Sequence, residues 1–210
     1  MDRKAIREAM QSVYERNAAR FDAERDRSGM EEAWLERFAA RIPPGGAVLD
    51  AGCGTGDPIS RWFIERGFVL TGVDYAAPMI DIAAARFPEA EWRVGDMRTL
   101  DLGARYAALV SWHAFFHLTA EEQRAVLKRL AAHAEPGAPL LFTVGPRAGE
   151  VLAQVGGEPV YHASLDQAGY AAALDAASFD VVDFVPEDAS VGEASVLLAR
   201  TRAQPASGSP

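Results

Sequence analysis

The chain has 210 residues, of which 30 are acidic and 21 basic, so its net charge at neutral pH is −9. This excess of acids disfavours a nucleic-acid substrate, because proteins that grip a phosphate backbone present basic patches. We find no apolar run near the ~20 residues of a membrane helix and no apolar signal segment, so we expect a cytoplasmic, soluble protein without a membrane partner. The single cysteine excludes an internal disulfide, and we expect no metal site.

The N-terminal part reads as two amphipathic helices. Apolar residues recur at helical spacing in residues 3–21 and again from about 30 to 40. The stretch 42–46, in which two prolines and two glycines follow Ile42, then ends the second helix and leads into the first strand. We therefore expect three parts: an N-terminal helical lid (1–41), one α/β domain (42–200) and a disordered tail (201–210).

From residue 47 onwards, apolar strands alternate with helices. Strands are predicted at 47–51, 68–73, 91–94, 107–112 and 139–144, and helices at 58–66, 78–86 and 119–133. The last of these helices begins with a capping box, Thr119 and Glu122. Such alternation indicates a parallel sheet with helices on both faces. The remainder reads as a loop-rich stretch, a helix at 165–177 and two paired strands at 179–185 and 194–200.

Residues 48–56, VLDAGCGTG, carry the most informative motif of the chain. Glycines 52, 54 and 56 let the backbone turn sharply between strand and helix and let a ligand approach the main chain. A dinucleotide fold requires G-x-G-x-x-G, whose last glycine would fall on Asp57, so the spacing disfavours a nicotinamide cofactor. The pattern D-x-G-x-G-x-G resembles the first motif of class I S-adenosylmethionine-dependent methyltransferases.

Three successive strands each end in an acid: Asp50, Asp74 and Asp96. The fourth strand ends in Trp112 and His113. Ligands of doubly wound sheets bind beyond the carboxyl ends of the strands, so we expect these side chains to meet at one edge. An acid after the second strand suits a ribose diol, although any one aspartate alone is more often a turn or cap residue.

The methyltransferase resemblance covers most of residues 47–145 and implies both a fold and a donor. The implied fold is a doubly wound, mostly parallel seven-stranded sheet with an antiparallel C-terminal hairpin. The implied donor is S-adenosyl-L-methionine. The residues that would contact or surround the donor are Asp50, Gly52, Cys53, Gly54 and Gly56 near its methionine part, Asp74 at the ribose, Tyr75, Met79, Asp96 and Met97 around the adenine, Trp112 beside the methyl group and Tyr14 on the lid.

The same resemblance places acceptor chemistry at His113 and His117, which we take as candidate catalytic bases. The alternative is that either histidine only hydrogen-bonds the loop backbone. Tyr14 and Phe21 are expected either to face the sulfonium or to pack the N-terminal helix onto the domain. Ser164 lies in a segment expected to cover the substrate, and it is also a candidate N-cap.

The sequence therefore predicts a methyltransferase that acts on a small molecule, with an oxygen, nitrogen or carbon acceptor. We expect a monomer or a homodimer. The main alternative is a non-catalytic S-adenosylmethionine-binding protein that regulates another enzyme. A nicotinamide-dependent oxidoreductase and a nucleic-acid methyltransferase are disfavoured by the glycine spacing and by the net charge, respectively.

Overall fold

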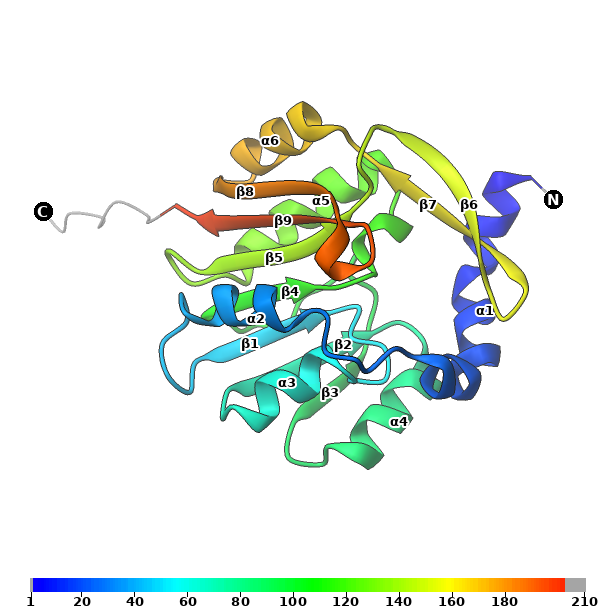
Figure 1. Cartoon of the computed structure of the whole chain (residues 1–210), viewed down its shortest axis with the longest axis horizontal. Coiled ribbons are helices and arrows are strands. Elements are labelled where there is room, and N and C mark those ends of the chain that lie inside the picture. Colours follow the sequence, from blue (N-terminus) through cyan, green and yellow to red (C-terminus); the bar gives the residue numbers. More distant parts are fainter. Residues whose placement is uncertain (1, 203–210) are drawn as a thin grey trace, which may run out of the picture.

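The computed structural model describes residues 2–202 (Figure 1). The strands are β1 (Ala47–Ala51), β2 (Val69–Asp74), β3 (Glu91–Val94), β4 (Ala108–Ser111), β5 (Pro139–Val144), β6 (Gly149–Val155), β7 (Glu158–Ser164), β8 (Phe179–Asp188) and β9 (Ala194–Thr201). The helices are α1 (Arg3–Glu24), α2 (Glu32–Ala39), α3 (Ile59–Glu65), α4 (Ala77–Arg86), α5 (Ala120–Ala132) and α6 (Gln167–Ala176), with short 3₁₀ turns η1 (Phe115–His117) and η2 (Ala189–Val191).

The main sheet has seven strands in the order β3-β2-β1-β4-β5-β9-β8. β1 to β5 pair in parallel, whereas β9 runs antiparallel to both β5 and β8. This topology confirms the predicted fold class. Because β1 to β4 are parallel neighbours, their carboxyl ends lie along one edge, and Asp50 pairs in register with Gly72 and Asp74 with Val94.

Helices cover both faces of the sheet, as expected from buried parallel strands. On one face α5 and α6 pack through Leu127 and Tyr170 onto Phe142 of β5. On the other face α2 and α3 pack through Phe38 and Phe63, with α2 and α3 in front of the sheet in Figure 1 and α5 behind it. α2 is thus part of the main core, and within the first 41 residues α1 is the helix that stands apart from it.

A β-hairpin occupies residues 149–164, where the sequence was interpreted as loop-rich. That interpretation was wrong because the glycines were read as loop residues, whereas Gly156 and Gly157 have φ of +59° and +84° and form the two-residue turn. The hairpin packs against α1, with Val160 and Tyr161 contacting its buried face (Figure 1). Its partner is therefore the N-terminal helix.

Of the two helix caps expected from the sequence, the structure confirms one and corrects the other. The predicted capping box of α5 is present, since Thr119 N donates to Glu122 Oε2 at 2.7 Å and Glu122 N donates to Thr119 Oγ1 at 3.2 Å. The candidate cap Ser164 is instead the last residue of β7, and Asp166 caps α6 by accepting from Gly169 N.

Near the carboxyl end, β9 continues to Thr201, and Arg202 N donates to Ser178 O, so the first residues of the predicted tail belong to the fold. The rest of that predicted tail, 203–210, lies outside the described residues. Within the part of the chain that is described, no helix is both long and apolar enough to cross a membrane.

Candidate functional site

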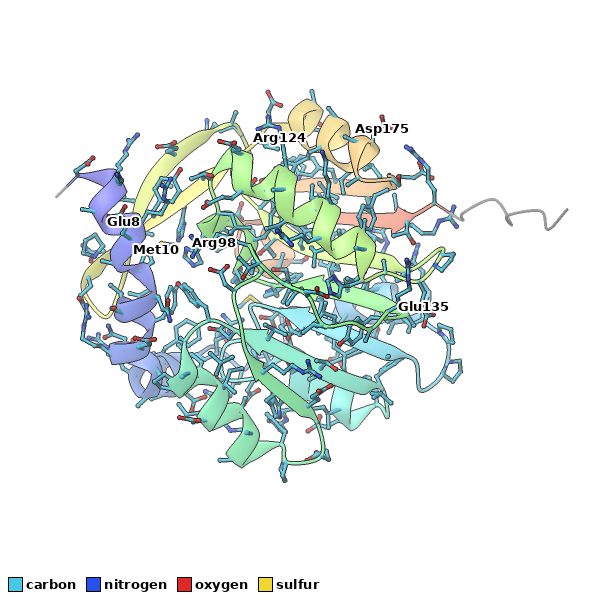
Figure 2. All side chains as sticks on the ribbon, turned by 180° about the vertical axis from the view of Figure 1, so that it is seen from behind. Glu8, Met10, Arg98, Arg124, Glu135 and Asp175 are labelled. Carbon is cyan, nitrogen blue, oxygen red and sulfur yellow. The ribbon has the colours of Figure 1, made fainter. Side chains whose placement is uncertain are left out.

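A cavity of about 480 Å³ lies between α1 and the carboxyl edge of β1 to β4. Glu8 and Met10 line it from α1, and Arg98 lines it from the loop after β3; all three are labelled in Figure 2. All the site residues predicted from the sequence except Gly56 also line it: Tyr14, Asp50, Gly52, Cys53, Gly54, Asp74, Tyr75, Met79, Asp96, Met97, Trp112, His113 and His117. The structure therefore brings four strand ends, a glycine turn and the N-terminal helix to one cavity.

Two glycines of the turn, Gly52 and Gly56, have different structural roles. Gly52 has φ of +83°, and a Cβ there would lie 2.2 Å from the Cβ of Ala114. Its missing side chain thus allows the loop after β4 to approach the turn. Gly56 lies outside the cavity, and a Cβ there would come within 2.8 Å of the Trp92 ring. Gly56 serves helix and strand packing behind the turn.

Two of the strand-end acids make hydrogen bonds in and beside the glycine turn. Ser60 Oγ donates to Asp50 Oδ2 at 2.6 Å, and burial raises the pKa of Asp50 to about 7. Asp74 accepts from Gly54 N at 3.0 Å and from Ala76 N at 2.9 Å, and burial raises its pKa to about 6. Since a carboxylate offers about four lone-pair sites, Asp74 retains capacity to accept further hydrogen bonds from a ligand.

The third acid, Asp96, lies at the more open rim. Its carboxylate pairs with the guanidinium of Arg98 at 2.6 Å and also accepts from Arg98 N at 2.8 Å. Arg98 lines the cavity too, and sequence reasoning missed it, because a lone arginine in a turn carries no distinguishing pattern.

Tyr14 and His117 join α1 to the wall formed by η1. The hydroxyl oxygen of Tyr14 lies 2.7 Å from His117 Nε2, and His117 Nδ1 lies 3.0 Å from the carbonyl oxygen of Tyr161. A carbonyl only accepts, so Nδ1 carries the ring hydrogen and Nε2 accepts from the Tyr14 hydroxyl. Burial lowers the pKa of His117 to about 4, which keeps the ring neutral. Burial and the nearby charge of Asp74 raise the pKa of Tyr14.

His113 directly follows Trp112 at the end of β4. Its φ is +56°, and its backbone N donates to Thr143 Oγ1 at 2.8 Å, which fixes this unusual turn. Burial lowers the pKa of His113 to about 4, so its ring is a neutral proton acceptor beside the cavity. A third histidine, His162 of β7, packs with its ring centroid 4.8 Å from that of His117.

Three residues that line the cavity carry a buried polar side-chain atom without a hydrogen-bond partner among the described residues: Oδ1 of Asp57, the hydroxyl of Tyr75 and Nε1 of Trp112. Buried polar groups are normally hydrogen-bonded, so unpaired polar atoms gather in the residues around this cavity. Apolar side chains such as Met79 and Met97 line the same space, so the cavity fits a ligand with both polar and apolar parts.

Sequence reasoning also left two arginines out of the predicted site. Arg7 and Arg25 both line the cavity from the N-terminal segment. Arg25 was noted as part of the N-terminal helix expected to help select the substrate, but neither arginine was assigned to the site, because bases in residues 3–27 alternate with acids as on a solvated helix surface.

The fold and this strand-edge cavity agree with the class I S-adenosylmethionine-dependent methyltransferase resemblance of the sequence. Residues 48–137 match the family described as "Methyltransferase domain", and this part of the chain belongs to it. The match spans the glycine turn, the strand-end acids and both histidines of the cavity.

Curated relatives match over the same core. The chain is 34% identical over 100 residues to dTDP-3-amino-3,4,6-trideoxy-alpha-D-glucopyranose N,N-dimethyltransferase of Streptomyces venezuelae, covering 47% of this chain and 42% of that protein. It is 31% identical over 132 residues to magnesium-protoporphyrin O-methyltransferase of Rhodobacter capsulatus, covering 60% of this chain and 57% of that one. The chain thus spans about half the length of the curated relatives it matches.

Solved structures resemble nearly the whole chain. The 1,6-didemethyltoxoflavin-N1-methyltransferase of Burkholderia thailandensis superposes with a TM-score of 0.75 at 22% identity, covering 96% of this chain and 91% of that one. An amino pentose methyltransferase from Micromonospora echinaspora gives a TM-score of 0.68 at 22% identity, covering 87% and 94%. At these sequence identities, the structural similarity establishes the fold alone.

Proposed function

We propose that this chain transfers a methyl group from S-adenosyl-L-methionine to a small molecule with an amine or hydroxyl acceptor. The observation that carries the proposal is the cavity, which gathers the glycine turn, the strand-end acids and two neutral histidines under α1. When bound, the donor supplies an electrophilic methyl group on a sulfonium. The protein has to bind, orient and desolvate the two reactants, and positioning alone can supply ~7–11 kcal/mol.

On the donor side we assign roles by free hydrogen-bonding capacity. Asp74 still has acceptor sites beyond Gly54 N and Ala76 N, which suits a ribose diol. Asp50 is bound to Ser60 and nearly inaccessible, so its proposed role is to order the turn. Asp96 and Met97, at the end of β3, are proposed to receive the adenine.

On the acceptor side, we propose that His113 takes the proton that the methyl acceptor releases. Among the described residues the His113 ring makes no hydrogen bond, whereas Nε2 of His117 is already occupied by Tyr14. A neutral imidazole can take the proton that an amine or hydroxyl releases on methylation. His117 then acts as a positioning residue, because it holds the Tyr14 hydroxyl toward the cavity. The acceptor itself is proposed to lie between Trp112 and these side chains.

Calorimetric titration with S-adenosylhomocysteine, NAD and NADP tests the donor. We expect binding of S-adenosylhomocysteine alone, weakened about 10- to 100-fold in Asp74→Ala because charge-assisted hydrogen bonds are lost. Asp81→Ala is the matched control, since Asp81 is an exposed acid of α4 outside the cavity. Binding of a nicotinamide cofactor instead would contradict the proposal.

Turnover is tested by following S-adenosylhomocysteine release with a panel of small amines and alcohols. We expect at least one acceptor to be methylated, and His113→Asn to lower kcat more than it changes donor affinity. Tight donor binding without turnover of any acceptor would favour the regulatory alternative. Light scattering of the same preparation distinguishes a monomer from a homodimer.

A further inference from the structure

One buried glutamine side chain joins two separate segments beside the cavity wall that η1 forms. Gln123 lies in the first turn of α5, next to Arg124, which is labelled in Figure 2, and it is completely buried. Its Nε2 donates to the carbonyl oxygen of Leu118 at 3.0 Å and to that of Ala163 in β7 at 2.8 Å. Carbonyl oxygens only accept, so the nitrogen end of the amide faces them and both of its hydrogens are used.

The other end of the same amide continues into a hydrogen-bond network. Its Oε1 accepts from the hydroxyl of Tyr170 in α6 at 2.9 Å. The Tyr170 oxygen lies 2.9 Å from Oγ of Ser164, and that Oγ accepts from the backbone N of Gly145 at 3.0 Å. Three side chains thus link the loop after η1, β7, α6 and the loop after β5. A buried network whose members are all hydrogen-bonded favours one geometry.

The two carbonyls that Gln123 holds are close in sequence to the two partners of a hydrogen bond at the cavity. Leu118 directly follows His117 and itself lines the cavity. Ala163 lies two residues after Tyr161, whose carbonyl oxygen is 3.0 Å from His117 Nδ1. Gln123 therefore ties the segment that carries the imidazole to the strand that carries its acceptor.

The start of α5 gives this amide a fixed base. The capping box of Thr119 and Glu122 closes the first turn, and Gln123 N donates to the carbonyl oxygen of Thr119 at 2.8 Å. A fully buried amide costs free energy unless it is hydrogen-bonded, so burial alone does not favour a glutamine here. An apolar side chain of similar length could fill the same space, but it could not donate to either carbonyl.

We propose that Gln123 is a positioning residue for the acceptor side of the cavity, because it fixes His117 relative to β7 and, through His117, the Tyr14 hydroxyl. The inference rests on the proposed function and adds to it a residue that acts from outside the cavity. His117 Nδ1 has to face the Tyr161 carbonyl for Nε2 to accept from Tyr14 at 2.7 Å. If the segment after η1 moves away from β7, the ring is free to adopt its other tautomer, and the Tyr14 hydroxyl is no longer held at the cavity.

The test observes the His117 ring directly, through the side-chain nitrogen chemical shifts of the histidines in NMR spectra of the ligand-free protein. The His117 signals are those that disappear in His117→Phe. We expect the unmodified protein to show the Nδ1–H tautomer alone at neutral pH. Gln123→Met removes both donors but keeps a side chain of similar length, so we expect it to show both tautomers.

Gln123→Glu carries the test if thermal unfolding shows that Gln123→Met does not fold. It keeps the shape of the side chain and an acceptor for Tyr170, but it cannot donate to both carbonyls. We therefore expect both His117 tautomers in this variant as well.

Leu127→Ala is the matched control. Leu127 is a fully buried apolar residue one turn further along α5, so its truncation lowers stability without removing a hydrogen bond. We expect it to keep the single Nδ1–H tautomer and an unchanged kcat with an acceptor found in the panel above. With the same acceptor, Gln123→Met should lower kcat about 10-fold, because part of the rate that positioning supplies is lost. Its affinity for S-adenosylhomocysteine should be unchanged.

A folded Gln123 variant that keeps the single tautomer would overturn the proposal, because Gln123 would then serve only the packing of the core. A mixture of tautomers in Leu127→Ala would overturn it too, since the change would follow from lost stability. A changed tautomer with unchanged kcat would do the same, because the position of His117 would have no part in the reaction. If the unmodified chain has the single tautomer but methylates no acceptor, the proposed function is overturned, and the positioning role with it.

Discussion

The hydroxyl of Tyr14 donates a hydrogen bond to Nε2 of His117, at 2.7 Å and across 103 residues of sequence. This contact ties α1 to the wall of the cavity that carries the candidate acceptor chemistry. His117 in turn donates from Nδ1 to the carbonyl of Tyr161 in the hairpin β6–β7. Three separate segments are thus held in one geometry by a single imidazole, so docking of α1 and assembly of this wall are coupled.

A double-mutant cycle measures that coupling. We expect Tyr14→Phe and His117→Phe each to lower the free energy of unfolding, and the double variant to lose less than the sum. The expected coupling is about 0.5–1.5 kcal/mol, the usual net value of one hydrogen bond. Urea unfolding of the four proteins gives the number. Full additivity would mean that the 2.7 Å contact contributes nothing to stability.

Donor binding should depend on pH through Asp74. Its pKa is raised by burial to about 6, so the carboxyl is largely protonated at pH 5 and ionised above pH 7. The ionised form is the better acceptor for ribose hydroxyls, so the affinity for S-adenosylhomocysteine should rise between about pH 5 and 7. Calorimetry across this range checks the slope, which should flatten in Asp74→Asn. An unchanged slope in that variant would assign the titration to another group.

The raised pKa values of Asp50 and Asp74 also make the free energy of unfolding of the ligand-free protein depend on pH. Between the ordinary pKa of an aspartate and the raised value, the folded state holds more protons than the unfolded state. The contributions of Asp50 and Asp74 are therefore fully present at low pH and are lost as the pH rises through about 6 to 7. Accordingly, Asp50→Asn should gain stability relative to the unmodified protein as the pH increases from 5 to 8, as measured by urea unfolding.

Gly52 should tolerate no side chain. Gly52→Ala places a Cβ 2.2 Å from Ala114 and forces an L-residue to φ of +83°, so both packing and backbone oppose it. Gly103→Ala separates the two effects, because φ there is +63° but nothing lies within 4 Å of the added Cβ. We expect Gly103→Ala to cost about 1 kcal/mol, and Gly52→Ala to cost clearly more and to abolish S-adenosylhomocysteine binding. Comparable losses in the two variants would show that the contact with Ala114 is relieved.

An ionic cluster fastens the end of α1 beside the glycine turn. Arg86 of α4 pairs with Asp22 at 2.6 Å, and Arg27 pairs with Asp57 at 2.7 Å. Partly exposed pairs each contribute about 0.2–1 kcal/mol, so we expect Arg86→Met to speed S-adenosylhomocysteine dissociation about two- to fivefold in stopped-flow measurements. High salt should have a similar effect on the unmodified protein. Arg61→Met, which breaks a pair within α3, should leave the rate unchanged.

Several features of this protein could be predicted because their causes lie within a few neighbouring residues. The strand–turn–helix at 47–65 follows from an apolar run and glycines at fixed spacing, and the capping box of Thr119 and Glu122 needs only one turn of helix. The hairpin β6–β7 was missed because its glycines were read as loop residues, although Gly156-Gly157 is also a local signal for a two-residue hairpin turn. The helix α1 on which it packs lies more than a hundred residues away in the sequence, so no local pattern specifies that contact.

By itself the sequence determined the parallel sheet, its order of strand-end acids and the glycine turn, since apolar periodicity and turn chemistry act over short stretches of chain. The tertiary structure alone decided that Tyr14 meets His117 and that Arg25 lies at the same cavity as Trp112. These pairs depend on which face of α1 docks against the hairpin and the strand edge. That choice is made by burial of Ile6, Met10 and Val13 against residues more than a hundred positions away, which no local pattern specifies.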